Sequence, residues 1–216
     1  MKKIKAVEEP KLSLVPSSFM LGGVKWHVNF LQKLEDDDLG DCYDADCQIR
    51  LSLSSRDIPI VEEKIQETFF HELTHAILYS MGSRYTYKES FVQVVGALTY
   101  QFVKSCGIKT LPEFKIVNKF TLFGLPWSVV TFTREEQIDL NKDNVPIDRP
   151  GGVRDSQSTV WFVTQGNETK DKAMFLRVFL SALLGAFDHS LYKDQVFCTT
   201  FSAFLLQAFT TATYNV

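Results

Sequence analysis

The sequence has little of several features that would assign a protein class directly. It contains only 4 cysteines in 216 residues, too few for a disulfide scaffold and typical of a reducing compartment. The net charge of −3 gives no broad basic surface for nucleic acid or anionic lipid. The longest apolar run, residues 173–187, is interrupted by Arg177 and is shorter than the roughly 20 residues of a membrane-spanning helix. We therefore expect a globular protein with neither nucleic-acid nor membrane partners.

The early residues also lack the pattern of an export signal. Three early lysines are followed by Glu8, Glu9 and Pro10, where a secretory signal would need an apolar segment. We expect a cytoplasmic protein. The 45% of hydrophobic residues, with 18 phenylalanines, are sufficient to fill a core.

Histidine is scarce as well, yet two of the 4 histidines stand in the pattern His-Glu-x-x-His at residues 71–75. Residues four apart lie on one face of a helix, so His71 and His75 can direct ring nitrogens at the same ion, with Glu72 beside them. Two imidazoles, a carboxylate and an open position for water describe a catalytic zinc site. Glu72 would be the general base that takes a proton from metal-bound water. The motif therefore predicts bound Zn2+.

The third protein ligand is expected on the next helix. The motif helix should begin with Pro59 in its first turn and stop at Gly82, and a second helix should begin near Lys88. Glu89 lies in the first turn of that helix, where the helix dipole favours a carboxylate, and Gly96 on the same face would allow close approach to the motif helix. The buried stripe of the motif helix is predicted to be Val61, Ile65, Phe69, Leu73, Ala76 and Ile77. The competing ligands are Asp41, Cys42, Asp44, Asp46 and Cys47.

Strands are expected before the motif helix. Residues 21–31 form a predicted strand after a Gly-Gly turn, and residues 40–43 with 47–53 form a predicted β-hairpin. Cys42 and Cys47 flank the hairpin turn. A disulfide or a soft-metal site between them is therefore an alternative to two ordinary buried thiols.

The hairpin sequence GDCYDADCQIRLS, the motif HELTHAIL and the segment ESFVQVVGALTYQF together resemble the minimal gluzincin metallopeptidases. Within that group, the chain is most similar to small phage-encoded metallopeptidase-like proteins distantly related to the ImmA/IrrE type. The resemblance covers residues 21–105. It implies zinc on His71, His75 and Glu89, Glu72 as the base, and the strand of residues 49–53 beside the substrate.

The second half of the chain repeats the first. Residues 21–28 align with 122–129, and the hairpin of residues 43–51 aligns with 154–162. The motif helix aligns so that its zinc positions become Ser181, Ala182 and Gly185, while Glu89 meets Gln195 or, one residue off, Asp194. The predicted fold is α+β, with two tandem zincin-like units, each a small antiparallel sheet or hairpin followed by two packed helices. Residues 1–107 would form the metallopeptidase unit and residues 108–216 a degenerate repeat without the metal site.

Two functions are compatible with this pattern. One is a zinc metallopeptidase that cleaves a protein or peptide substrate, including a host protein if the chain is phage-encoded and acts in the host cytoplasm. In that enzyme, Tyr85 or Tyr87 would donate to the oxyanion. The alternative is a non-catalytic phage protein that binds and inhibits a host factor. An intact Glu72 favours the enzyme, because a structural zinc site needs no base. The apolar C-terminal helices would pack against the first copy or form a homo-oligomer.

Overall fold

A computed structural model of the chain describes residues 12–134, 136, 150–187, 191 and 193–214. The early lysines and the residues that follow them lie outside this part. No helix among the described residues is long and apolar enough to cross a membrane. The chain divides into two compact units. Unit 1 comprises Met1–Tyr100, Ile108–Glu113 and Gln207–Val216, and unit 2 comprises Gln101–Gly107 and Phe114–Leu206. The domain boundary expected between residues 107 and 108 stays a prediction.

Unit 1 contains a four-stranded sheet in the order β1-β2-β4-β3. Its strands are β1 (Ser18–Leu21), β2 (Val24–Leu31), β3 (Gly40–Tyr43) and β4 (Gln48–Ser52). The predicted hairpin is confirmed as the antiparallel pair β3 and β4. The sheet as a whole is mixed and not antiparallel as expected, because β2 and β4 run parallel. The Gly-Gly turn joins β2 to β1, a strand that the sequence analysis missed.

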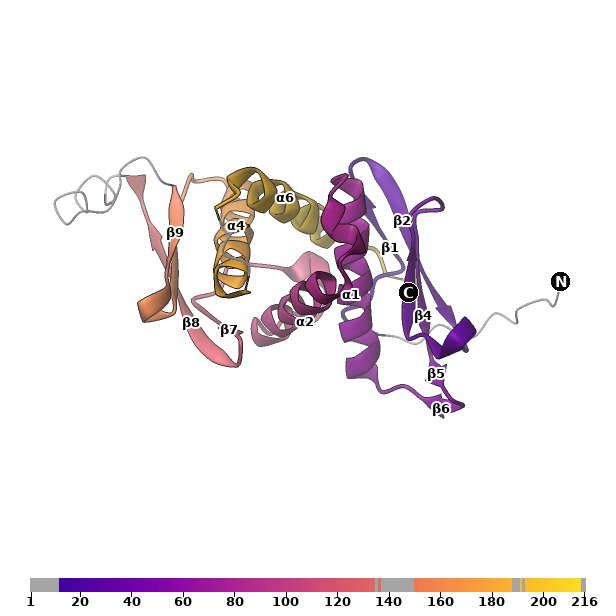
Figure 1. The fold of residues 1–216 in the computed structure, drawn as a ribbon. Coiled ribbons are helices and arrows are strands. Elements are labelled where there is room, and N and C mark those ends of the chain that lie inside the picture. Colours follow the sequence, from indigo (N-terminus) through magenta and orange to yellow (C-terminus); the bar gives the residue numbers. More distant parts are fainter. Residues whose placement is uncertain (1–11, 135, 137–149, 188–190, 192, 215–216) are drawn as a thin grey trace. The chain divides into compact units, whose positions relative to one another are not determined.

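Two helices follow this sheet (Figure 1). They are α1 (Glu62–Ser80) and α2 (Glu89–Ser105). Gly82 ends α1 with a φ of 62°, as predicted. The predicted start was wrong, because Pro59 belongs to a small ladder of β5 (Ser54–Ser55) and β6 (Ile58–Pro59). Val61 is 66% exposed and does not join the buried stripe, whose other members are buried.

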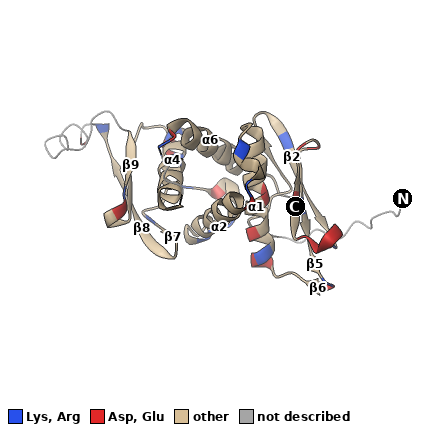
Figure 2. Ribbon diagram, viewed as in Figure 1, with Lys and Arg blue, Asp and Glu red and all other residues tan. Residues whose placement is uncertain are grey.

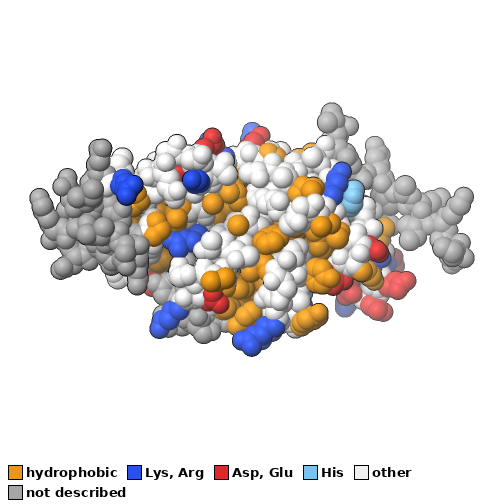
Figure 3. Space-filling model, turned by 90° about the horizontal axis from the view of Figure 1, so that it is seen from above, with side chains coloured by type: hydrophobic (Ala, Val, Ile, Leu, Met, Phe, Trp, Pro, Cys, Tyr) orange, Lys and Arg blue, Asp and Glu red, His pale blue; other side chains and the backbone are white. Residues whose placement is uncertain are grey.

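Short 3-10 segments connect these elements. They are η1 (Glu35–Asp37), η2 (Arg84–Tyr87) and η3 (Leu111–Glu113). Figure 2 shows acidic and basic residues interspersed along the elements, with η1 as a wholly acidic segment. Figure 3 shows hydrophobic side chains scattered among polar ones on one face of the molecule.

Unit 2 repeats the order of elements found in unit 1. Its sheet has the order β7-β8-β10-β9, again with a parallel central pair. The strands are β7 (Lys119–Leu122), β8 (Leu125–Phe132), β9 (Gly151–Arg154) and β10 (Thr159–Val163). The turn between β9 and β10 includes η5 (Asp155–Gln157). The helices are α4 (Glu168–Phe187) and α6 (Gln195–Thr211), and the last residues of α6, from Gln207 on, belong to unit 1.

Equivalent residues of the two sheets make equivalent contacts. Phe19 stacks on Trp26 across β1 and β2, with ring centroids 6.4 Å apart, and Phe120 stacks on Trp127 across β7 and β8 at 6.2 Å. The hairpin turns also agree, since the last turn residue has a left-handed backbone in both units. The repeat seen in the sequence is therefore a repeat of strand pairing and packing, not only of apolar pattern.

Candidate metal centre

The His-Glu-x-x-His residues form one cluster on α1, as the sequence predicted. Ligand atoms of His71, Glu72 and His75 all lie within 4.8 Å of one another. This follows from helical spacing, because both histidines project from the same face of α1 one turn apart. The cluster can hold a metal ion.

Glu89 reaches both histidines from the first turn of α2. Its Oε1 lies 2.8 Å from His71 Nε2, and its Oε2 lies 3.3 Å from His75 Nε2. Zinc bonds of about 2.0–2.2 Å place neighbouring ligand atoms of a tetrahedral site about 3.3–3.6 Å apart. The contact of Glu89 with His75 has this spacing and that with His71 is somewhat shorter. The donor set of two imidazoles and one carboxylate therefore fits zinc.

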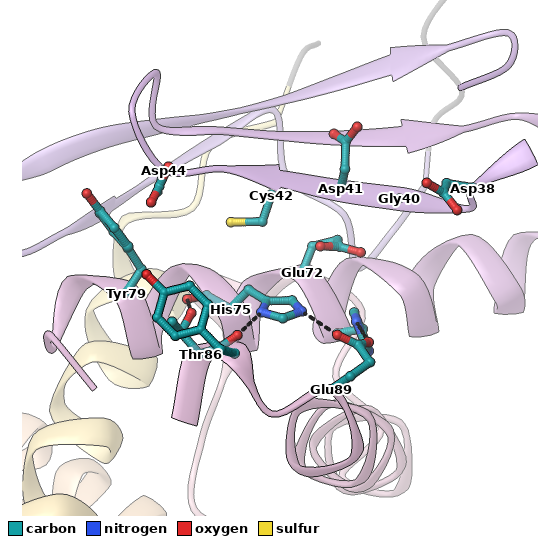
Figure 4. A pocket seen from close by; sticks show the side chains of 12 residues that line it. Asp38, Gly40, Asp41, Cys42, Asp44, Glu72, His75, Tyr79, Thr86 and Glu89 are labelled. Atoms are coloured by element: carbon teal, nitrogen blue, oxygen red, sulfur yellow. Dashed lines mark hydrogen bonds and ion pairs between the residues drawn. The ribbon is translucent and has the colours of Figure 1, made fainter. Parts of the chain in front are cut away.

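The tautomer of His75 is fixed by a backbone carbonyl. His75 Nδ1 lies 3.0 Å from the carbonyl oxygen of Thr86 (Figure 4). A carbonyl can only accept a hydrogen bond, so Nδ1 carries the proton and a neutral ring has its lone pair on Nε2. That lone pair faces Glu89, and the two repel unless a cation or a second ring proton lies between them. The same arrangement orients histidine ligands in metal sites.

The electrostatics at His71 also favour ligation. Burial lowers the pKa of His71, against the opposing effect of the Glu89 carboxylate. The neutral ring that can bind a metal is therefore the main form near neutral pH. Gly96 of α2 lies directly against the backbone of His71, as predicted, so α2 can carry Glu89 close to α1.

Glu72 is buried beneath β3, with only 5% of its surface exposed. A Cβ built on Gly40, the first residue of β3, would lie 2.6 Å from Thr68 Cγ2 and 3.0 Å from Glu72 Oε1. Glycine is therefore needed where the strand passes over the acid. Burial raises the pKa of Glu72 to about 8, and the carboxylates of Asp41, Glu89 and Asp38 add to the rise.

These side chains line a cleft of about 470 Å³ in unit 1. Figure 4 shows β3 along one side and α1 along the other. The bordering strand is thus β3, whereas residues 49–53 were expected there, and Ile49 and Leu51 are fully buried. The lining consists of Asp38, Gly40, Asp41, Cys42, Asp44, His71, Glu72, His75, Tyr79, Thr86, Tyr87 and Glu89.

The sequence left Tyr85 and Tyr87 as alternative oxyanion donors, and only one of them lines the cleft. Tyr87 lines it, whereas the ring of Tyr85 packs against Phe91 with centroids 4.8 Å apart. Tyr79 also lines the cleft and was missed. Its spacing of seven residues from Glu72, two helical turns on the same face, is the signal that would have found it.

The competing ligands from the hairpin are engaged elsewhere or lie apart. Asp41 makes a two-point ion pair with Arg50, and Asp44 accepts a hydrogen bond from the backbone of Ala45 at 2.7 Å. Cys42 and Cys47 are both free, so the disulfide alternative does not hold. Cys42 pairs across the ladder with Ile49 and not with Cys47, and burial raises the pKa of the Cys42 thiol.

At the equivalent positions of unit 2, Ser181, Ala182, Gly185 and Gln195 offer neither imidazole nor carboxylate. The alternative counterpart of Glu89, Asp194, accepts a hydrogen bond from Phe197 N at 2.9 Å at the start of α6. Ser181 and Ala182 are buried on α4, and Gln195 accepts a hydrogen bond from Arg177 Nη1 at 2.7 Å. In the described part of the chain, His71, Glu72 and His75 form the one group of possible metal ligands found in the structure.

Comparison with family models, with curated proteins and with solved structures finds no match. The candidate centre must therefore be judged by its own geometry.

Proposed function

We propose that the chain is a zinc-dependent peptidase of the gluzincin type, with His71, His75 and Glu89 as metal ligands and Glu72 as general base. The observation that carries this proposal is the contact of one carboxylate, that of Glu89, with the Nε2 atoms of both motif histidines. Glu89 has 70% of its side chain exposed, so burial does not force it into this position. A cation between the three groups would account for their convergence.

Each residue has a separate task in the reaction. Zinc, when bound, would polarise the peptide carbonyl and make water a better nucleophile. Glu72 is buried in the cleft and close to the histidines, so it can take a proton from the attacking water and pass it to the leaving amine. A nearby cation would lower the pKa of Glu72 and favour the carboxylate needed for this step. Thr86 holds His75 through its carbonyl.

Tyr87 is the proposed donor to the developing oxyanion. It lines the same cleft as Glu72 and is 86% exposed, so its hydroxyl can turn toward a bound substrate. Tyr85 lacks this access and is not proposed. Tyr87→Phe should therefore lower kcat more than it raises KM.

The test combines zinc content with proteolysis. Purified protein should contain near one zinc per chain, and His71→Ala and Glu89→Gln should lose it. Glu72→Gln should keep zinc but lose about 100-fold or more of its activity on an unfolded protein such as casein. Glu63→Gln, an exposed change of the same chemistry on α1, is the control and should alter neither.

Other outcomes would assign the site differently. Zinc that is retained in Glu89→Gln and lost in Glu72→Gln would make Glu72 the third ligand and overturn the proposal. Zinc at full occupancy without chelator-sensitive cleavage of any peptide would favour the binding protein over the enzyme.

A further inference from the structure

The cleft is lined by many acidic residues. Five of its twelve lining residues carry a carboxyl group, and neither lysine nor arginine is among the described residues that line it. Glu72 is 95% removed from solvent and has no hydrogen-bond partner among the described residues, although its carboxyl group points into the cleft (Figure 4). Such a cleft should attract a positively charged ligand.

Two of these carboxyl groups already have partners. Asp41 pairs with Arg50, and Glu89 contacts both histidines. Asp38 and Asp44 make no ion pair with any described residue. Figure 4 places these two at opposite ends of the cleft, so they cannot share one small ion.

Asp44 is held in a fixed position. Its Oδ1 accepts from Ala45 N at 2.7 Å, and its carbonyl oxygen accepts from Cys47 N at 3.2 Å. Its Oδ2 has no hydrogen-bond partner among the described residues, and Asp44 is one of the residues that line the cleft. A fixed carboxylate with one oxygen available can bind an ammonium or guanidinium group.

An aromatic ring stands at the same end. Tyr79 is 44% exposed, projects from the last turn of α1 and reaches toward the end of the cleft where Asp44 lies (Figure 4). The face of a tyrosine ring attracts a cation and packs against the methylene groups that carry it. Tyr87 gives the cleft a second exposed ring.

We propose that the Asp44 and Tyr79 end of the cleft is a specificity subsite for a lysine or arginine side chain of the peptide substrate. The ring of Tyr79 would contact the aliphatic stem and the cation, and Asp44 Oδ2 would bind the charged group. This inference rests on the proposed function, since it names the substrate class of the same cleft. A metal ion is a poorer occupant of this end, because Asp44 is the one carboxyl group that the described lining residues place there and hard cations require several oxygen ligands.

The test uses two readouts that depend differently on catalysis. Zinc-loaded protein is given a library of random synthetic peptides, and the cleavage sites are mapped by mass spectrometry. Separately, anisotropy measures the binding of labelled peptides that contain lysine or its neutral analogue norleucine to the zinc-loaded Glu72→Gln variant. We expect cleavage next to lysine or arginine, and binding of the lysine peptide about tenfold tighter than that of the norleucine peptide.

Variants locate the preference. Asp44→Asn and Tyr79→Ala should reduce it to about twofold or less, while Tyr79→Phe should keep it because the ring remains. Asp46→Asn is the matched control, since it removes a charge from the same turn outside the cleft.

Cleavage without preference for basic residues would overturn the inference and leave the peptidase proposal intact. Absence of cleavage with a lysine preference that depends on Asp44 would support the subsite while the peptidase proposal fails. Equal binding of both peptides would overturn the inference in either case.

Discussion

Gly96 of α2 lies so close to His71 of α1 that the two helices touch through their backbones. A Cβ atom at Gly96 would stand 2.7 Å from His71 Cα and 3.0 Å from His71 N. Neither backbone atom can move aside alone, so any larger residue must push the helices apart. The ligand pair is thus tied to helix packing, since Glu89 belongs to α2 and the histidines belong to α1.

Gly96→Ala should therefore weaken zinc binding. Alanine normally stabilises the middle of a helix by about 0.5–1 kcal/mol relative to glycine, but here the displaced α2 would carry Glu89 away from His71. We expect at least about a tenfold loss of zinc affinity, because second-shell changes at metal sites typically cost that much or more. Titration with a competing zinc chelator measures it.

The control for this variant is Gln93→Ala, which raises helix propensity at an exposed position of the same helix. Its zinc affinity should equal that of the unchanged chain. A Gly96→Ala protein with higher melting temperature and unaltered zinc affinity would contradict the packing described here.

The parts of the site that the sequence predicted are those set by local geometry. The spacing of His71 and His75 and the position of Glu89 at a helix start follow from helical periodicity and end signals. The close approach at Gly96 was also foreseen, because a glycine among larger helix residues indicates backbone contact. Local rules sufficed for these features.

The features that could not be predicted from the sequence depend mostly on contacts between residues far apart in the chain. The parallel pairing of β2 with β4 places β3 at the sheet edge and makes β3, not residues 49–53, the border of the cleft. Pro59 was assigned to α1 because proline suits a first turn, but its pairing with Ser54 takes it into a strand. Tyr85 and Tyr87 could not be distinguished from the sequence, since the 3-10 segment that holds them is only 4 residues long, too short to show a repeating face.

Replacing either of two equivalent turn residues with glycine should change the stability of the protein in the same direction. Cys47 and Ser158 occupy the same hairpin position in the two units and have φ angles of 50° and 45°. A side chain in this left-handed region costs about 1–2 kcal/mol, which glycine avoids at the expense of greater unfolded-chain entropy. Cys47→Gly and Ser158→Gly should each stabilise the protein by up to about 1 kcal/mol, measured by urea denaturation. A loss of stability in both variants would contradict the backbone conformation described.

The core of unit 2 depends on a stacked aromatic pair. Phe102 of α2 and Phe179 of α4 have ring centroids 3.9 Å apart, and both side chains are fully buried. Phe179→Ala should lower the free energy of unfolding by about 3–5 kcal/mol through lost contacts and the cavity left behind. Leu125→Ala, at a residue 58% exposed in β8, is the control and should cost far less. A similar small loss in both variants would mean that this pair is not at the centre of the core.

Glu72 should make the metal-free protein less stable as the pH rises. Its pKa of about 8 in the folded protein lies above the ordinary value of 4.5, so folding favours the protonated acid. The stabilisation is complete below pH 4.5 and is lost as the pH rises through 8, with a total of a few kcal/mol, roughly 1.4 kcal/mol for each pKa unit. Urea denaturation of chelator-treated protein at intervals of pH measures this loss.

The cleanest interval is pH 7 to 8, because His71 contributes a constant amount there. Burial lowers the pKa of His71 below 6.5, so its effect is lost only as the pH falls through that lower range. Glu72→Gln has no charge to bury and should remove the loss of stability between pH 7 and 8. Bound zinc should reduce or reverse it in the unchanged chain, since a cation favours the Glu72 carboxylate. A metal-free protein whose stability does not fall across this interval, or falls equally with glutamine at position 72, would show that burial does not raise the pKa of Glu72.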